Sequence, residues 1–441
     1  MAVPSPLLLL LPLLLCYGVG NVRCSPVHGS NIDLHSLLDF RQGITSDPNE
    51  VLKSWNTSVH HCRWRGVMCT PKRPWRVSGL NLTGRSLGGQ ISSSLGNLTF
   101  LNHLDFSNNN FFGPLPVLNR LQQLQNLTLG SNRCKGQFLT HLQILPAYHT
   151  WTSPQTFWWN NLTGTIPQTL GDITSLKVLY LYENQLNGSI PDKIWQLPNL
   201  VYLLLGQNSL SGGMPQALRN QSSLTTLGLE LNMLGNTLPT NVGNALPNLV
   251  VLNLGNNTFE GQIPASLGNA SMLQEIDLSR NKFVGKIPPL GKLSNLSYLN
   301  LGENRLEASY NNSWEFLHSL RNCSYLQAFS LSQNLLEGHI PNSIGNLSSN
   351  LQYLILSGNK LSGIVPPSIG NLQNLTWLGL DFNNLIGPID EWIGKLTNLV
   401  RLNLRENNLN GPIPPSISNL TQLTKLFLGG NEFTGLIPPS L

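Results

Sequence analysis

The sequence predicts a solenoid, a chain of short turns stacked on one another, and three observations support this. One asparagine position recurs along most of the chain, mainly at a spacing of 24 residues. Around it lies a common frame, L-x-x-L-x-x-L-x-L-x-x-N-x-L-x-G-x-I-P, which residues 197–215 illustrate. A unit this short cannot bury its own apolar face, so successive units have to stack.

The first turn carries Arg85 at the recurring position, and every later turn carries asparagine. An asparagine amide both donates and accepts hydrogen bonds, so it can satisfy turn backbone groups that would otherwise be buried unpaired. Stacked turns should align these amides in a ladder. The predicted ladder consists of Asn109, Asn132, Asn160, Asn184, Asn208, Asn232, Asn257, Asn281, Asn304, Asn334, Asn359, Asn383, Asn407 and Asn431.

Each turn begins with a short strand pattern. In one turn Leu375, Leu378 and Leu380 alternate with polar residues, as a half-buried strand requires. Proline usually follows the outer isoleucine, and its missing N–H discourages a helix there. The outer side of most turns is therefore expected to hold a second short strand or an irregular turn.

Two intervals depart from the regular spacing. The stretch from Asn304 to Asn334 is longer, and its apolar residues between 308 and 320 have helical spacing, which predicts a helix on the outer side. The repeat is degenerate over residues 137–159, which have lost the leucine frame and gained tryptophans. A shifted reading frame through residues 137–158 can encode a regular repeat, so we hypothesise a frameshift or gene-model error there.

The N-terminus carries an apolar block that is too short to span a bilayer as a stop-transfer helix, so residues 1–24 are predicted to be a cleaved secretory signal, with an uncleaved anchor as the alternative. No later segment has about 20 continuous apolar residues. Asn-x-Ser/Thr sequons agree with a secretory route. The candidate glycosylation sites are Asn56, Asn81, Asn97, Asn126, Asn161, Asn187, Asn220, Asn256, Asn269, Asn295, Asn311, Asn322, Asn346, Asn374 and Asn419.

Composition and motifs exclude several function classes. Charged residues make up 11% of the chain, the net charge is +5, and no Lys/Arg run suggests nucleic-acid binding. No nucleophile–histidine arrangement emerges, so no catalytic, metal or cofactor site is predicted. Cys62 and Cys69 should form a small loop disulfide in an oxidising compartment. A metal site formed by these cysteines with His60 and His61 would fit no standard zinc spacing. Cys323 is expected to be a buried thiol.

Residues 31–72 contain a helix-like segment from Leu34 to Trp55, the pair Trp55–Asn56 and the motif C-x-W-x-G-V-x-C from Cys62 to Cys69. This block resembles the N-terminal cap of plant leucine-rich-repeat receptors, and residues 77–441 resemble their repeats, about 15 in number. The resemblance implies a right-handed leucine-rich-repeat solenoid. It would have one β-strand per repeat on the concave face, short strands, 3-10 turns and an occasional helix on the convex face, and a helical cap.

The L-x-G-x-I-P variant and the long repeat after Asn304 are similar to immune receptor kinases of the bacterial-blight-resistance and elongation-factor-receptor type. This resemblance implies an extracellular domain that binds a peptide or microbial protein in defence or developmental signalling. A co-receptor kinase with leucine-rich repeats is the implied second partner. The implied location is the cell surface, or the apoplast if the protein is secreted.

The chain has no glycine-rich phosphate loop and no H-R-D or D-F-G segment, so it is not predicted to be an enzyme. It stops at Leu441 inside a repeat, so a membrane link would require a missing C-terminal segment. We expect a fragment, a truncated allele or a partial gene model rather than a secreted decoy receptor. The alternative function is a secreted inhibitor of microbial cell-wall-degrading enzymes, similar to polygalacturonase inhibitors.

Residues between the strand leucines should face the concave surface, where exposed aromatic residues and arginines are frequent interface anchors. Scattered aromatic residues are also normal on such a face. Two groups are predicted as ligand-binding candidates. The N-terminal patch is Tyr180, Tyr182 and Tyr202, and the C-terminal patch is Trp377, Phe382, Arg401 and Arg405.

Overall fold

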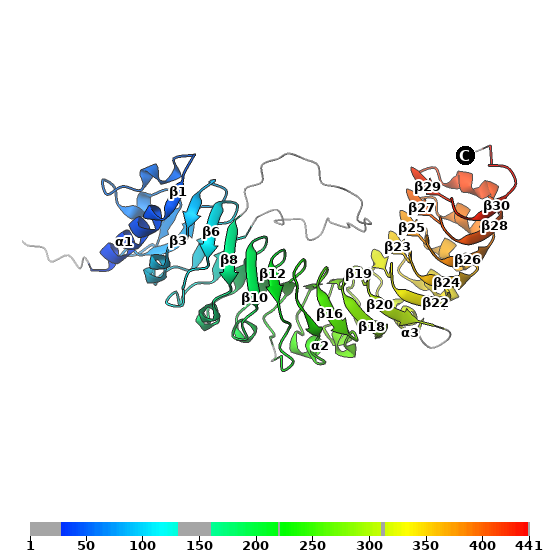
Figure 1. Ribbon diagram of the computed structural model, residues 1–441, viewed down its shortest axis with the longest axis horizontal. Coiled ribbons are helices and arrows are strands. Elements are labelled where there is room, and N and C mark those ends of the chain that lie inside the picture. The colour runs from blue at the N-terminus through cyan, green and yellow to red at the C-terminus, as the bar shows by residue number, and fades with distance from the viewer. Residues whose placement is uncertain (1–27, 131–159, 219–220, 310–313, 440–441) are drawn as a thin grey trace, which may run out of the picture.

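The computed structural model describes residues 28–130, 160–218, 221–309 and 314–439, and in it the turns stack into one curved solenoid (Figure 1). The predicted fold class is confirmed. The periodic leucines of the strands are buried, as Leu203 and Leu205 illustrate with an exposed fraction of 0% each. One continuous apolar core therefore runs through the stack.

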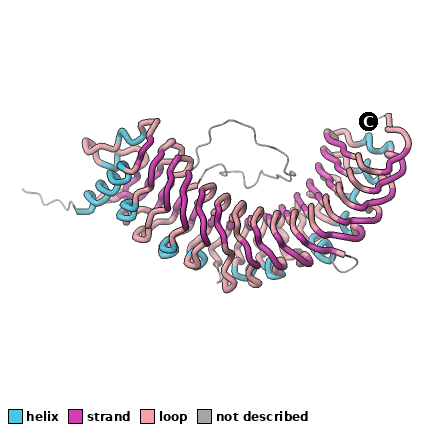
Figure 2. Tube along the Cα trace, in the orientation of Figure 1, coloured by secondary structure: helices cyan, strands magenta, loops and turns pink. Residues whose placement is uncertain are grey.

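A long sheet lines the concave side of the arc (Figures 1 and 2). Within the described residues it has 15 strands, parallel except at the antiparallel pair formed with the cap. In chain order they are β2 (Val67–Cys69), β3 (Val77–Asn81), β5 (His103–Asp105), β7 (Asn126–Thr128), β9 (Val178–Tyr180), β11 (Tyr202–Leu204), β13 (Thr226–Gly228), β15 (Val251–Asn253), β17 (Glu275–Asp277), β19 (Tyr298–Asn300), β21 (Ala328–Ser330), β23 (Tyr353–Ile355), β25 (Trp377–Gly379), β27 (Arg401–Asn403) and β29 (Lys425–Phe427).

The second strand of each turn follows the recurring asparagine, and these strands form two further sheets within the described residues. One comprises β4 (Gly88–Gln90), β6 (Asn110–Pro114), β8 (Asn161–Thr165), β10 (Gln185–Ser189) and β12 (Ser209–Ser211), and the cap strand β1 (Ile44–Ser46) joins it by pairing antiparallel with β4. The other comprises β14 (Gly235–Thr237), β16 (Thr258–Gly261), β18 (Lys282–Lys286), β20 (Arg305–Ala308), β22 (Leu335–His339), β24 (Lys360–Gly363), β26 (Asn384–Gly387), β28 (Asn408–Pro412) and β30 (Glu432–Thr434).

Short helices cover the outer side of the arc (Figure 2). Most are 3-10 turns that begin just after the proline of the repeat frame, a position that tolerates proline because the first N–H groups of a helix have no partner within it. The helix predicted in the long repeat is α3 (Glu315–Leu320). The others are η3 (Ser93–Asn97), η5 (Gln168–Asp172), η6 (Ile194–Gln196), α2 (Val242–Ala245), η7 (Ala265–Asn269), η9 (Asn342–Asn346), η10 (Pro367–Asn371), η11 (Glu391–Lys395) and η12 (Pro415–Asn419).

The N-terminal cap is less continuous than expected. Helix α1 (His28–Gln42) ends before Gly43, strand β1 follows, and η1 (Val51–Ser54) completes the segment that was predicted as one helical stretch. A Cβ atom at Gly43 would lie 2.9 Å from the carbonyl oxygen of Gln90. The glycine therefore lets the cap backbone approach the first turn closely, which a continuing helix would prevent.

The cap covers the apolar edge of the first turn with aromatic rings and one buried ion pair. Trp55 and Trp64 stack with centroids 5.3 Å apart, beside η2 (His61–Arg63). The Asp33 carboxylate is fully buried and accepts from Nη2 and Nε of Arg76 at 2.8 and 3.0 Å. Cys62 and Cys69 are joined in a disulfide, with Cα atoms 5.6 Å apart.

The recurring asparagines connect the turns by hydrogen bonds. The Asn383 amide nitrogen donates to the carbonyl oxygens of Leu356 and Leu380 at 3.1 and 3.0 Å, and its oxygen accepts from the Leu361 N–H at 3.0 Å. Asn383 is 8% exposed, so these backbone groups have little access to water. The other described ladder asparagines make the same contacts, for example Asn109 and Asn431.

The stacking of turns continues from the repeat before residues 137–159 directly to the repeat after them. Strand β7 pairs directly with β9, so Asn126 is the register partner of Val178. The Asn160 amide donates to the Leu129 carbonyl at 2.7 Å. Asn160 thus follows Asn109 in the ladder and completes the turn that Leu127 and Leu129 begin. Asn132, the candidate signal and the hypothesised frameshift region lie outside the described residues.

Candidate ligand-binding surface

The C-terminal patch is assembled by the concave sheet. Trp377 and Arg401 are register partners on β25 and β27, and their side chains project outward between buried leucines. The Arg401 guanidinium carbon lies 4.3 Å from the centroid of the Trp377 ring and 5.6 Å from that of Phe427. Phe427, on β29, was not among the predicted residues, although its place between Leu426 and Leu428 could have indicated it.

The other half of the patch lies where the strands turn toward the asparagine ladder. Phe382 has a positive φ of 53° and is 49% exposed. The Arg405 guanidinium carbon lies 4.9 Å from the centroid of the Phe382 ring, and its Nη2 lies 3.6 Å from the Glu406 carboxylate. The structure therefore brings all four predicted residues together in two neighbouring arginine–aromatic pairs.

Arg401 has no carboxylate within ion-pair distance of 4.0 Å among the described residues. Its Nε and the Trp377 Nε1 are both buried and have no hydrogen-bond acceptor in the described structure. Burial lowers the pKa of Arg401, and the Asp381 charge counteracts this effect. The Arg401 side chain is only partly buried, and its charge has no ion-pair partner in the described structure, so the guanidinium is suited to an acceptor supplied from outside.

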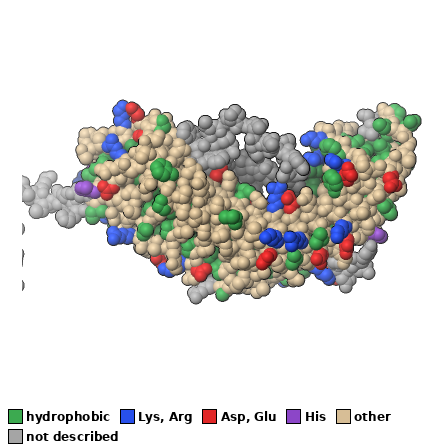
Figure 3. Space-filling model, viewed as in Figure 1, with side chains coloured by type: hydrophobic (Ala, Val, Ile, Leu, Met, Phe, Trp, Pro, Cys, Tyr) green, Lys and Arg blue, Asp and Glu red, His purple; other side chains and the backbone are tan. Residues whose placement is uncertain are grey.

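Asp381 is the acidic residue whose charge acts on Arg401. Burial raises the pKa of the Asp381 carboxyl, whereas the Ser357 hydroxyl that donates to it and the charges of Arg401 and Arg405 lower it. The carboxylate is held by Ser357, which leaves the guanidinium of Arg401 free for another partner. Basic, acidic and hydrophobic side chains gather on the inner side of the arc toward the C-terminal turns (Figure 3).

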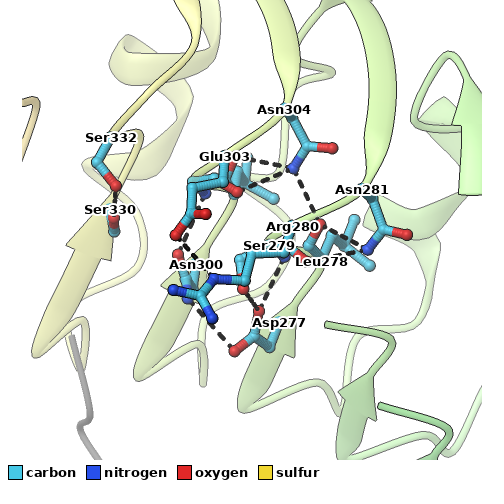
Figure 4. A network of polar contacts seen from close by, with 12 residues as sticks. Asp277, Leu278, Ser279, Arg280, Asn281, Asn300, Glu303, Asn304, Ser330 and Ser332 are labelled. Carbon is cyan, nitrogen blue, oxygen red and sulfur yellow. Dashed lines mark hydrogen bonds and ion pairs between the residues drawn. The ribbon is translucent and has the colours of Figure 1, made fainter. Parts of the chain in front are cut away.

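The middle of the concave face differs because Asp277, Arg280 and Glu303 have hydrogen-bond or ion-pair partners there (Figure 4). The Asp277 carboxylate accepts from the Ser279 backbone and hydroxyl at 2.9 and 2.6 Å and from the Asn300 amide at 3.3 Å. Arg280 Nε lies 2.8 Å from the Glu303 carboxylate. These groups already have partners, so this network has less to offer a ligand than the C-terminal patch.

The N-terminal patch was expected to be exposed, and the structure corrects this for two of its three residues. Tyr180 and Tyr182 are only 9% and 8% exposed, whereas Tyr202 is 42% exposed. Tyr180 packs with Leu204, and a Cβ atom at Gly206 would lie 2.7 Å from the Tyr182 ring. A glycine on the next turn thus lets the Tyr182 ring lie against the sheet, which the alternation pattern did not reveal.

Other predicted positions are placed as follows. Two candidate glycosylation sites lie on or near the concave face: Asn126 is half-buried in strand β7, and Asn256 is exposed just after strand β15. The sequons at Asn220 and Asn311 lie outside the described residues. Among the described residues, one cluster has the side chains to hold a metal ion. It consists of His60, His61 and Cys62, whose ligand atoms lie within 4.8 Å of one another. Because Cys62 is bonded to Cys69, it offers no thiolate for a metal. Cys323 is a buried free thiol.

Family profiles match the N-terminal cap and several parts of the solenoid. The leucine rich repeat N-terminal domain matches residues 30–70, and leucine rich repeat profiles match residues 158–210, 248–270, 272–292, 325–347, 350–372, 398–420 and 422–441. The crystal structure of PEPR1–AtPEP1 is similar over 93% of this chain and 53% of that chain, with a TM-score of 0.79 and 31% identity. The chain is a leucine-rich-repeat protein similar to plant receptor-like-kinase ectodomains.

Curated relatives of this leucine-rich-repeat protein include the receptor kinases EFR of Arabidopsis thaliana and Xa21 of Oryza sativa subsp. japonica. EFR is 43% identical over 95 residues, 21% of this chain and 9% of EFR. Xa21 is 47% identical over 79 residues, 17% of this chain and 8% of Xa21. The matches thus span about a tenth or less of each kinase, and the similarity is confined to the repeat region.

A second solved structure, the ectodomain of the Arabidopsis receptor kinase HAESA with an IDA peptide hormone ligand, has a TM-score of 0.61 and 27% identity. It covers 93% of this chain and 71% of that chain. Among the described residues of this leucine-rich-repeat protein, no helix has the length and apolar character needed to cross a membrane.

Proposed function

We propose that this leucine-rich-repeat protein is an extracellular recognition domain that binds a peptide or protein on its concave face through the C-terminal patch. The observation that carries the proposal is the half-buried guanidinium of Arg401, which lies between two aromatic rings and has no carboxylate partner among the described residues. Buried charges in proteins are normally paired, so a ligand that supplies the missing acceptor would gain binding energy there.

The ligand group that fits best is a carboxylate presented beside an apolar surface. A guanidinium binds carboxylates through charge-assisted hydrogen bonds, and the rings of Trp377 and Phe427 already hold the Arg401 guanidinium in place. We therefore propose an acidic peptide segment as the ligand class.

The similarity to receptor ectodomains extends the proposal to its setting. PEPR1 and HAESA were crystallised with the peptides named above, which supports a peptide ligand over a small molecule. We propose a role in defence or developmental signalling at the cell surface, with a leucine-rich-repeat co-receptor kinase as the second partner. Asparagine-linked glycans and a cleaved signal are part of the same proposal.

The experiment is a binding selection on the secreted protein. A displayed peptide library is enriched on the wild-type chain, and the enriched peptides are measured against Arg401→Gln and Trp377→Leu. The expected result is enrichment of acidic peptides and at least tenfold weaker binding to both variants. Comparing each peptide with its C-terminally amidated form separates a side-chain carboxylate from a terminal one.

Arg305→Gln serves as the matched control, because Arg305 is an exposed arginine on strand β20, which does not belong to the concave sheet. Its binding should equal that of the wild type. Peptides that bind all variants equally would contradict the proposed site. Capture of a fungal polygalacturonase, with no peptide enrichment, would favour the inhibitor function instead.

A further inference from the structure

A shallow groove borders the C-terminal patch at the edge where the concave strands begin. Its volume is about 560 Å³, within the range of pockets that hold small ligands. Amide side chains dominate its lining, including those of Asn350, Gln352, Asn374, Asn398 and Gln422. Amides both donate and accept hydrogen bonds, so the groove matches the hydroxyl and acetamido groups of a sugar better than it matches an apolar ligand.

Asn374 occupies this groove as part of a second asparagine ladder that the sequence pattern did not reveal. Its Nδ2 donates to the Ser349 carbonyl at 2.8 Å, and its Oδ1 lies 3.5 Å from Nδ2 of Asn398. Asn350 and Asn398 donate in the same way to carbonyls of the preceding turn, at 3.0 Å each. The direction of the Asn374 side chain is thereby fixed.

Asn374 is also the acceptor residue of the sequon Asn374-Leu375-Thr376. The amide has two N–H hydrogens, and the ladder uses one of them. A glycan replaces the other hydrogen, so the ladder bond and the modification are compatible. Because the side chain is exposed and lies in the groove lining, the first sugar attached to it starts within the groove.

We infer that Asn374 carries an N-glycan whose first sugar lies in this amide-lined groove and forms one wall of the C-terminal patch. The inference rests on the secretory route in the proposed function. Trp377 follows Asn374 by three residues and lies on the strand that begins there. The glycan closes the patch on this edge, so a ligand approaches from the opposite edge, where Phe382 and Arg405 are exposed.

The test combines glycopeptide mapping with hydroxyl-radical footprinting of protein secreted from eukaryotic cells. Mass spectrometry should find Asn374 occupied. Val400, which lines the groove and is 40% exposed, should be oxidised at least twofold more in Asn374→Gln than in the wild type. Thr376→Val, which removes the sequon but keeps Asn374, should give the same increase. Phe382 oxidation should stay unchanged in both variants.

Asn187→Gln is the matched control, because Asn187 is an exposed sequon residue on β10, outside the groove. It should leave Val400 oxidation unchanged. An unmodified Asn374 would overturn the inference, and so would equal Val400 oxidation in wild type and both variants. Neither readout involves ligand, so this outcome is separate from failure of the acidic-peptide selection.

Discussion

Arg401 and Trp377 are register partners on adjacent strands, and the guanidinium lies over the indole ring at 4.3 Å. Elsewhere on the concave face Arg280 is paired with Glu303. The charge of Arg280 is neutralised within the protein, whereas the Arg401 guanidinium is held by aromatic rings and its Nε has no acceptor in the described structure. We therefore propose that the ligand-binding site lies at the C-terminal end of the surface.

Arg401→Met should separate binding from stability. The substitution removes a cation–π contact of about 0.5–1 kcal/mol but also relieves the burial of an unpaired charge, so the unfolding free energy should change by less than about 1 kcal/mol. Affinity for an acidic peptide from the selection should fall at least tenfold. Urea denaturation and titration calorimetry measure the two effects. A large stability loss would indicate a structural role instead.

Asp33→Asn should destabilise the cap by about 3–5 kcal/mol, because it leaves Arg76 with a broken buried pair. Fluorescence of the stacked Trp55 and Trp64 reports this loss during urea denaturation. Glu50→Gln is the control, since the Glu50–Lys53 pair is exposed and should contribute less than about 1 kcal/mol. Equal effects of the two substitutions would contradict the importance of burial.

Asn383→Ala should cost about 2–4 kcal/mol, because it leaves several buried backbone groups without a partner. The adjacent Asn384 is exposed on β26, and Asn384→Ala should change the unfolding free energy by no more than about 0.5 kcal/mol. Denaturation midpoints of the two variants provide the comparison. Equal denaturation midpoints for Asn383→Ala and Asn384→Ala would show that the asparagine ladder does not contribute to stability.

Glu230 should make stability depend on pH. Burial raises its pKa to about 7, with the charge of Asp277 adding to the increase, and its Oε2 has no hydrogen-bond partner in the described structure. The folded state therefore holds a proton that the unfolded state releases near pH 4.5. Stability from this group is present below pH 4.5 and is lost as pH rises toward 7.

Glu230→Gln removes that dependence because the amide does not ionise. The variant should melt at a higher temperature than the wild type at pH 8 and at a similar temperature at pH 4, as measured by thermal denaturation across this range. A variant less stable than the wild type at pH 8 would show that the carboxylate contributes favourably when charged.

Much of this architecture follows from the sequence because each turn obeys one local rule. The spacing of leucine and asparagine defines which residues enter the core and which satisfy the turn, and Asn383 occupies the predicted place. The cap pattern likewise indicated the Cys62–Cys69 pair. Alternation also identified the outward-facing positions of Trp377 and Arg401, since successive strand residues point to opposite faces.

Tertiary structure decided how the outward-facing residues are used. Alternation could not distinguish Tyr202, which is exposed, from Tyr182, which lies against the neighbouring turn beside Gly206. It also could not show that Asn160 continues the ladder after Asn109, or that Arg401 has no ion-pair partner in the part of the chain that the structure describes. Exposure and charge pairing depend on side chains from adjacent turns, about 24 residues away in sequence, so only the stacked structure determines them.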